Sequence, residues 1–584
     1  MADPGQGRAR SSRLLRRGLQ YTLLGGLLAF LAVFLLYPIF LTVRGGFASD
    51  PATGSGWSLD PLGLVLRDPR TAAALLNSFK IAVSTTTLAV LIALPLAVLN
   101  AGYRFPGKAI FNAMVLVPLI LPPFVGAIGM KMILGRQGAL NALLGTEMDV
   151  LGNAKILGVI AIQSLALYPI IYLNASASLA NLDPALNEAA ENLGAGPWRR
   201  FFTITLPLVR PGLFAGATIV FIWSFTELGT PLMFDCYEVM PVQIFYGLKE
   251  VENSTRPYVL TVLLLSCSIG LYVLGKLVFG GRAHAMYSKA SRASAETTLR
   301  GWAGWGAAGA FTLVFALAVL PHVGVVLTSV SEVGAWYGTV TPREYTAGHF
   351  MTALTDDDSF GAIANSLSLS LSAMVLNLLL GVLIGYVIVR TTLRGRGVLD
   401  ALCMLPLAVP GLVMAFGYVA MTLRWPFGKE GPLGDLVSVV SANPNPIPLL
   451  VVAYAVRRLP YIVRSTVAGL EQTSGELEEA AVNLGASRVT AVRRVIVPLI
   501  LANLIAGGLL VFSFSMLEVS DSLILAQQPR HYPITKAIFA FSERLGDGPA
   551  IASAMGVWGM SLLAVTLFAA SLLLGKKLGA IFRV

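Results

Sequence analysis

The chain has 584 residues, of which 55% are hydrophobic and only 12% are charged, with a formal net charge of +11. That much apolar surface exceeds what a soluble protein of this length can bury, so we expect an integral membrane protein. The basic residues are dispersed between apolar runs, which argues against nucleic-acid binding as the reason for the charge. The three cysteines match no metal spacing, and we expect them to be small buried hydrophobes.

Twelve apolar runs follow one another along the chain, each long enough to cross a bilayer in a helix, which takes about 20 residues. They are continuously apolar and do not alternate, so they predict helices and exclude barrel strands. The predicted spans are 21–43, 78–99, 109–130, 156–176, 213–234, 258–279, 302–330, 366–389, 398–421, 447–463, 501–523 and 555–574.

Lysine and arginine predict the orientation of these spans, because short cytoplasmic loops are enriched in both. Segment 1–20 is a basic amino terminus with five arginines, and basic residues recur in every second loop. We therefore expect both termini to be cytoplasmic. The basic residues of the alternate loops are Arg104, Lys108, Arg199, Arg200, Arg282, Lys289, Arg292, Arg394, Arg396, Arg488, Arg493, Arg494, Lys576 and Lys577.

One phrase occurs twice in these basic loops, as Glu-Ala-Ala-Glu-Asn-Leu-Gly-Ala at 188–195 and Glu-Ala-Ala-Val-Asn-Leu-Gly-Ala at 479–486. Glutamate and alanine favour a helix, and Gly194 or Gly485 permits a turn with positive φ that ends it. The phrase predicts a helix–turn–helix that exposes Glu188 or Glu479 to a partner's arginine. The alternative is an ordinary amphipathic loop held to the lipid headgroups by its arginines.

The repeat extends beyond the phrase. A shift of 288 positions aligns Asn77-Ser78 with Asn365-Ser366, and a shift of 291 aligns Glu227 with Glu518. We expect a first repeat at 21–280, a cytoplasmic linker at 281–301 and a second repeat at 302–584. Each repeat holds six spans, so the two insert in the same orientation as parallel repeats. Four aligned prolines predict breaks or bends beside a path between the repeats: Pro118, Pro122, Pro406 and Pro410.

The duplicated loop resembles the cytoplasmic signature loop of binding-protein-dependent ABC importer permeases of the type I fold. Two such domains in one chain are similar to the fused ferric-iron transport permease group, to which thiamine permeases are also similar. The resemblance implies an all-α integral membrane fold with coupling loops at 182–207 and 473–498. It implies that the coupling residues are Glu188, Ala189, Ala190, Gly194, Glu479, Ala480, Ala481 and Gly485.

The same resemblance implies partners and a location. We expect two copies of an ABC ATPase subunit, an extracytoplasmic substrate-binding protein and a bacterial inner membrane. The chain itself is expected to be no enzyme and to bind no cofactor, with ATP and Mg on the ATPase. Its one near match to a phosphate-binding loop, at Gly270, has Leu277 where Ser or Thr must reach the magnesium. The first copy has Gly196-Pro197-Trp198 where the second has Ser487-Arg488-Val489, so we expect the loops to dock differently.

Charged side chains inside spans are costly and often functional. Glu227, Glu518 and Asp521 either line the translocation path, where carboxylates suit a hard cation such as ferric iron, or bond within the bundle or mark the interfacial ends of their helices. Arg457 and Arg458 either contact an anion or extend to the inner interface. A metal site cannot be assigned from the sequence.

Two classes of transporter remain. The best match is the passive permease of an ATP-driven importer working by alternating access, with ferric iron as the expected substrate and thiamine, phosphonate or polyamine as alternatives. An ion-coupled secondary transporter also has parallel six-span halves, yet it needs no duplicated docking loop. An enzyme finds no support in the four histidines.

Overall fold

The computed structural model describes residues 4–50, 54–119, 122–180, 182–279, 297–441 and 443–574. These residues are almost entirely helical, as expected for a chain that must satisfy its backbone within a bilayer. A small two-stranded parallel sheet pairs β1 (Tyr103–Arg104) of the first repeat with β2 (Thr297–Thr298). Strand β2 lies near the end of the predicted linker. Most of the predicted linker 281–301 lies outside the described residues.

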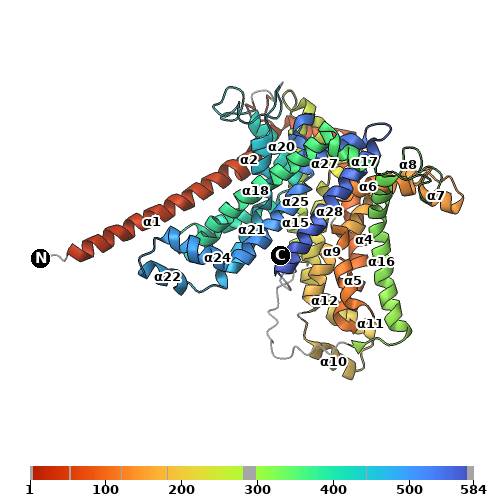
Figure 1. Cartoon of the computed structure of the whole chain (residues 1–584), viewed down its shortest axis with the longest axis horizontal. Helices are drawn as coiled ribbons and strands as arrows, with labels where there is room; N and C mark the ends of the chain where they lie inside the picture. Colours follow the sequence, from red (N-terminus) through yellow and green to blue (C-terminus); the bar gives the residue numbers. More distant parts are fainter. Residues whose placement is uncertain are drawn as a thin grey trace.

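The first repeat is built from long helices separated by short ones. The basic segment before residue 21 is part of α1, which projects from the rest of the molecule in Figure 1. The helices are α1 (Pro4–Leu31), α2 (Tyr37–Gly46), α3 (Asp60–Arg67), α4 (Pro69–Gly102), α5 (Lys108–Met114), α6 (Pro123–Leu134), α7 (Ala139–Leu144), α8 (Val150–Asn153), α9 (Lys155–Leu179), α10 (Pro184–Asn192), α11 (Pro197–Arg200), α12 (Leu206–Thr226), α13 (Gly229–Met233), α14 (Met240–Gly247) and α15 (Arg256–Phe279).

The second repeat follows the same order of long and short helices. In both repeats an aspartate begins the second long helix, and Asp68 and Asp356 accept a backbone N–H from its first turn. The helices are α16 (Trp302–Val330), α17 (Gly348–Thr355), α18 (Asp357–Arg390), α19 (Arg396–Ala408), α20 (Gly411–Thr422), α21 (Ile447–Glu471), α22 (Glu476–Asn483), α23 (Arg488–Ala491), α24 (Val497–Leu499), α25 (Leu501–Met516), α26 (Ser520–Leu525), α27 (Ile534–Ser542) and α28 (Gly548–Leu574).

Within the described residues, eight helices are long and apolar enough to cross a membrane, and three sharply bent pairs raise the number to eleven. The predicted spans 109–130 and 398–421 are two of these pairs, bent by 94° and 106° where Pro122 and Pro410 stand. The predicted break is confirmed at Pro122 and Pro410, whereas Pro406 lies inside α19 and Pro118 lies in a short 3-10 turn. The one remaining predicted span, 447–463, lies in α21, which is long enough but carries three arginines.

Matching hydrogen bonds show that the two halves repeat one plan. Asn77 donates to Glu238 O at 2.9 Å, and Ser78 Oγ accepts from Met240 N at 2.9 Å. The aligned Asn365 donates to Tyr532 O at 3.2 Å, and Ser366 Oγ accepts from Ile534 N at 2.7 Å. Each pair of bonds ties the second long helix of its half to a short helix that comes later in the same half: α4 to the start of α14, and α18 to the start of α27.

The first long helices are exchanged between the halves. The helix α2 packs against α20 of the second half, and α16 packs against α6 of the first. The approach is close at two aligned glycines: a Cβ at Gly417 would lie 2.7 Å from Pro38 O, and one at Gly129 would lie 2.5 Å from Pro321 O. This exchange makes the two halves one interlocked body.

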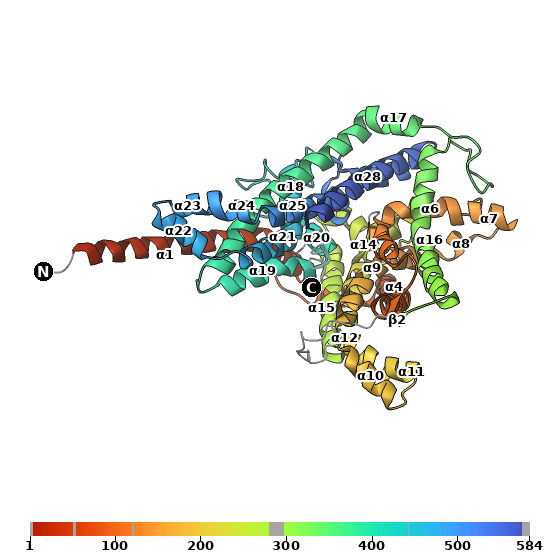
Figure 2. The same ribbon diagram turned by 60° about the horizontal axis from the view of Figure 1, so that its bottom comes forward.

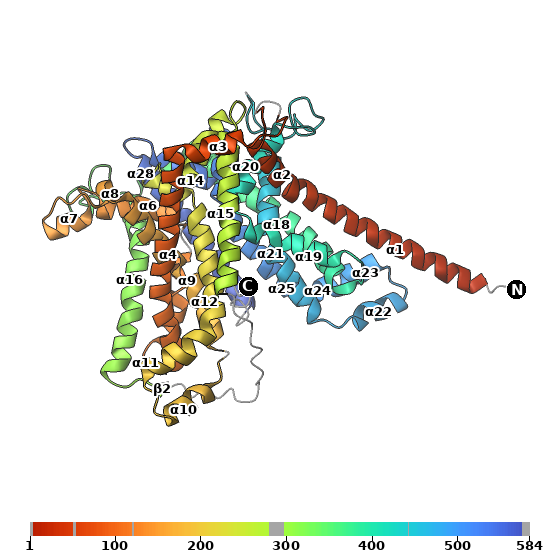
Figure 3. The same cartoon turned by 180° about the vertical axis from the view of Figure 1, so that it is seen from behind.

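The duplicated loops lie at the same end of the molecule. In Figures 1 and 3, α10 and α22 are at the lower ends of their bundles, opposite α17, α20 and α27. In Figure 2 they occupy separate corners, so the two loops do not touch. The loop at 182–207 is called the first loop below, and the loop at 473–498 is called the second loop.

Candidate functional site

The first loop folds as a helix, a tight turn and a second short helix. Asp183 accepts from Ala185 N at 3.0 Å and begins α10. The helix ends at Asn192, and the chain turns at Gly194, which has φ +82°. Gly194 N donates to Glu191 O at 2.8 Å and Ala195 N donates to Ala190 O at 2.9 Å, the paired bonds of a Schellman motif.

The second loop makes the same turn at the aligned residues. Gly485 has φ +93°, its N–H donates to Val482 O at 2.9 Å, and Ala486 N donates to Ala481 O at 3.1 Å. The turn with positive φ predicted from the repeated phrase is therefore present in both loops. In each loop the second short helix, α11 or α23, is followed by one π-helical turn, at Phe201–Thr205 or Val492–Ile496, before the membrane helix continues.

The tips of both loops expose side chains that a partner can contact. Glu188 and Glu479 are exposed, as are Ala189 and Ala480, whereas Ala190 and Ala481 are half-buried. Large apolar groups stand at matched positions beside the turns and are exposed, although exposed apolar groups are costly in water. These are Leu193 at 88%, Leu484 at 90%, Trp198 at 76% and Val489 at 77%.

A helix break forms the second candidate site, and it too is duplicated. In the first half α12 ends at Thr226 and α13 begins at Gly229, so Glu227 lies in the break. In the second half α25 ends at Met516 and α26 begins at Ser520, which places Glu518 in the equivalent break. The breaks meet across the interface, since a Cβ at Gly229 would lie 3.1 Å from Val519 Cγ1.

Glu518 is held by two arginines of α21. Arg458 Nη2 donates to its carboxylate, and Arg457 Nε lies 3.3 Å from Glu518 Oε2. Arg457 Nη1 also lies 3.9 Å from Asp521 Oδ2. Glu518 and Asp521 are 3% and 1% exposed, so their carboxylates form buried ion pairs. Removing one partner of such a pair is strongly destabilising, because it leaves a buried charge without compensation.

Glu227 has a much weaker setting. Its Oε1 accepts from Thr230 N and Thr230 Oγ1 at 3.4 Å each, so it caps α13 loosely. Electrostatic interaction with Glu518 and Arg457 reaches it across the interface. The aligned positions of Arg457 and Arg458 in the first half are Ala166 and Leu167. The two predicted path glutamates therefore differ in charge environment.

These contacts bear on the alternatives that the sequence left open. Arg457 and Arg458 are ion-paired with Glu518 inside the bundle, a contact that neither alternative foresaw. For Glu518 and Asp521 the contacts match bonding within the bundle. Nothing in the described residues groups three His, Cys, Asp or Glu side chains as a metal site would require. The role of Glu227, Glu518 and Asp521 in a translocation path stays a prediction.

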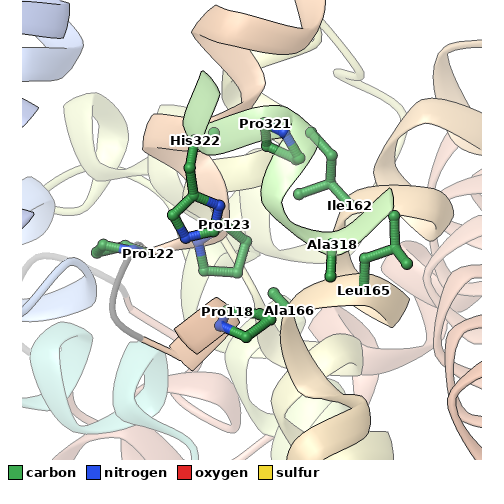
Figure 4. Close-up of a pocket in the computed structure, with 10 residues that line it drawn as sticks. Pro118, Pro122, Pro123, Ile162, Leu165, Ala166, Ala318, Pro321 and His322 are labelled. Atoms are coloured by element: carbon green, nitrogen blue, oxygen red, sulfur yellow. The ribbon is translucent and has the colours of Figure 1, made fainter. Parts of the chain in front are cut away.

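Two small cavities of about 10 Å³ each, enough for about one water, lie beside the proline breaks. The first is lined by residues of the first half and of α16, and the second is lined by residues of the second half. Pro118 lines the first and the aligned Pro406 the second. Ala166 lines the first where Arg457 lines the second. Figure 4 shows the His322 ring beside Pro123 at the first cavity, where neither ring nitrogen has a hydrogen-bond partner.

The partners of Glu518 were missed by the sequence interpretation. Arg457 and Arg458 lie 60 residues away on another helix, so local spacing gives no sign of the contact. A usable signal was that both charge signs occur inside spans of the same half, where each charge needs a partner. His322, on a span of the second half, was likewise not singled out.

Comparison with known proteins gives a consistent picture. A family model described as "Binding-protein-dependent transport system inner membrane component" matches residues 89–280 and 377–573. The chain is 27% identical over 423 residues to the putative ferric transport system permease protein FbpB 1 of Haemophilus influenzae, covering 70% of this chain and 63% of that protein. It is 26% identical over 425 residues to the ferric transport system permease protein FbpB of Actinobacillus pleuropneumoniae, covering 70% and 58%. These matches span less than two thirds of either relative.

A shorter relative matches more closely over a smaller part. The molybdenum transport system permease protein ModB of Escherichia coli K12 is 33% identical over 175 residues, covering 29% of this chain and 74% of that protein. The relatives therefore share the kind of protein and differ in the substrates that their names carry.

Proposed function

The chain belongs to the family of binding-protein-dependent transport system inner membrane components, and we propose that it is a membrane-spanning permease of an ATP-driven importer. The family model matches twice, once in each half, in line with a chain that supplies both permease domains. On this proposal the membrane is a bacterial inner membrane, and the ends of the bundles that carry the two loops face the cytoplasm.

The observation that carries the proposal is the pair of exposed helix–turn–helix loops. Two unrelated loops have no reason to share a Schellman turn, an exposed glutamate and an exposed leucine at aligned positions. Two copies of one ATPase would present the same pocket twice, which explains the duplication. An ion-coupled secondary transporter gives no such reason, so it is the weaker candidate.

Alternating access is the mechanism that we propose for this arrangement. ATP binding and closure of the paired ATPases move the two loops, and an external binding protein loaded with substrate acts at the opposite end. Each ligand shifts the two halves only by its differential affinity for the inward- and outward-open states. The two helix breaks meet between the halves, where Glu227 and Glu518 would border the path.

Ferric iron is the proposed substrate because two of the relatives are named for ferric transport. The carboxylates at the two helix breaks are only weakly suited to binding ferric iron, because the charge of Glu518 is already neutralised by Arg457 and Arg458. That setting is consistent with passage rather than retention, because a transported ion must not be held tightly on its way. Glu227 is left with weak contacts, and so is Asp521, whose ion pair with Arg457 spans 3.9 Å.

The test is uptake by proteoliposomes that contain the permease, its ATPase and its binding protein. We expect ferric iron to enter only with ATP, and Glu227→Gln to reduce uptake while the complex still assembles. Uptake of molybdate, thiamine, a phosphonate or a polyamine, with none of iron, would replace the substrate. Uptake driven by an ion gradient without ATP would contradict the class.

A further inference from the structure

The second loop is fastened to the end of α18 by side chains. Tyr386 Oη donates to Glu478 Oε1 at 2.8 Å and accepts from Arg488 Nη1 at 3.2 Å. Arg488 Nη1 also lies 3.7 Å from Glu478 Oε1. Glu478 is on α22 before the turn and Arg488 is on α23 after it, so one tyrosine holds both arms of the loop. Glu478 is only 6% exposed.

A second contact lies one helical turn further along α18. Arg390 Nη2 donates to Leu470 O at 3.0 Å, and to Thr473 O and Thr473 Oγ1 at 2.8 Å each. These acceptors lie at the end of α21 and just beyond it. Hydrogen bonds from a charged group are among the stronger ones, so this contact fixes the start of the second loop.

The first half cannot form these contacts. The positions aligned with Tyr386 and Arg390 are Val98 and Gly102, which have no polar side chain. The positions aligned with Glu478 and Arg488 are Asn187 and Pro197. What the first loop has is an ion pair within itself, from Arg200 to Glu191, which links its own two arms but does not reach α4.

The second loop is connected, through α18 and α21, to the helix break that contains Glu518. Two glycines let α18 pack closely on α21: a Cβ at Gly381 would lie 2.8 Å from Ile462 Cγ1, and one at Gly385 would lie 2.8 Å from Thr466 Cγ2. The same α21 carries Arg457 and Arg458, which hold Glu518. These contacts form a continuous chain from the second loop through α18 and α21 to the break.

We propose that Tyr386, Glu478 and Arg488 form a brace that makes the second loop the stiff one of the pair, through which ATPase movement is transmitted to the helix break. The first loop lacks the brace and follows the ATPase with less effect on its own half. This inference rests on the proposed function and adds that its two docking loops are mechanically unequal. The three brace residues are positioning residues.

Spin-label distances test the stiffness without any partner or substrate. In the full chain reconstituted in nanodiscs, with Cys236, Cys267 and Cys403 replaced by alanine, labels at Leu484 and Leu379 report the second loop against α18. Labels at the aligned Leu193 and Leu91 report the first loop against α4. All four side chains are exposed, at 90%, 61%, 88% and 64%.

We expect a narrower distance distribution for the second pair than for the first. Tyr386→Phe should raise the population of the released second loop by about tenfold, the ratio that corresponds to losing one hydrogen bond to a charged group. The triple change Val98→Tyr, Asn187→Glu and Pro197→Arg should narrow the first pair. Equal widths in the unmodified chain, or no change in Tyr386→Phe, would overturn the brace.

The functional arm compares transport with ATP hydrolysis in the complete complex, using ferric iron as the probe. Tyr386→Phe and Glu478→Gln should each lower the iron imported per ATP hydrolysed by roughly fivefold, while ATPase binding stays intact. Asn187→Ala, the matched change in the first loop, should leave this ratio unaltered. A ratio unchanged in both brace variants would contradict the proposal.

The two proposals fail in different ways. If the unmodified complex shows no ATP-dependent uptake, the proposed function is wrong, while the distance widths still decide whether the brace exists. If uptake is normal and the widths are equal, only the brace is wrong.

Discussion

The two halves of the chain share one backbone plan and differ in the side chains at the two candidate sites, the loop and the helix break. At the loop, Gly194 and Gly485 make the same turn, but only the second loop is tied to α18 by Tyr386. At the helix break, Glu227 is loosely held where Glu518 is locked by arginines. The comparison shows that duplication preserved the positions that shape the backbone, while the charged contacts diverged. Fusion of both halves in one chain permits this, because each half can change alone.

The largest difference between the halves should appear when the two aligned glutamates are changed to glutamine. Glu518→Gln leaves two half-buried arginines without their main anion and should lower the free energy of unfolding by about 3 kcal/mol. Glu227→Gln keeps an acceptor for Thr230 and should cost less than about 0.5 kcal/mol. Unfolding of the purified chain in mixed micelles measures both, and equal losses would remove the difference between the breaks.

How far the sequence predicts this molecule depends on which contacts are local. The glycines of the two turns, the broken helices at Pro122 and Pro410 and the two-fold repeat are visible in the printed residues, because turns and breaks depend on near neighbours. The exchange of α2 and α16 between the halves is not visible, since it depends on which helix surfaces fit. The same holds for the partners of Glu518 and Glu478, which come from other helices.

A smaller effect, of similar size in both halves, is expected where the exchanged helices cross. Gly129→Ala and Gly417→Ala place a methyl group against backbone that has little room to move, and should cost about 1–3 kcal/mol each. Gly306→Ala and Gly309→Ala on α16 meet nothing within 4 Å and serve as controls. Thermal unfolding of the four variants measures this, and tolerance of both crossing substitutions would show that the exchanged packing is loose.

The smallest change in stability, again alike in both halves, is expected at the turns. Gly194→Val and Gly485→Val must adopt a positive φ, which costs a residue with a side chain roughly 1–2 kcal/mol. Gly196→Val is the control, because Gly196 has φ −66° and open space around it. Hydrogen exchange of the loop amides should accelerate in the first two variants and less in the third. Identical exchange in all three would mean that the turns impose no strain.

The central claim is that the two loops are twin docking sites for one kind of ATPase subunit. Its most direct measurement is cross-linking from single cysteines at Leu193 and Leu484, both exposed at the turns, in membranes that contain the complex. A cysteine at Leu545, 94% exposed in the connection between α27 and α28 near the opposite end, is the control. We expect the first two to capture the same ATPase subunit, and the third to capture none. Capture of the ATPase from Leu545, or from neither loop, would contradict the claim.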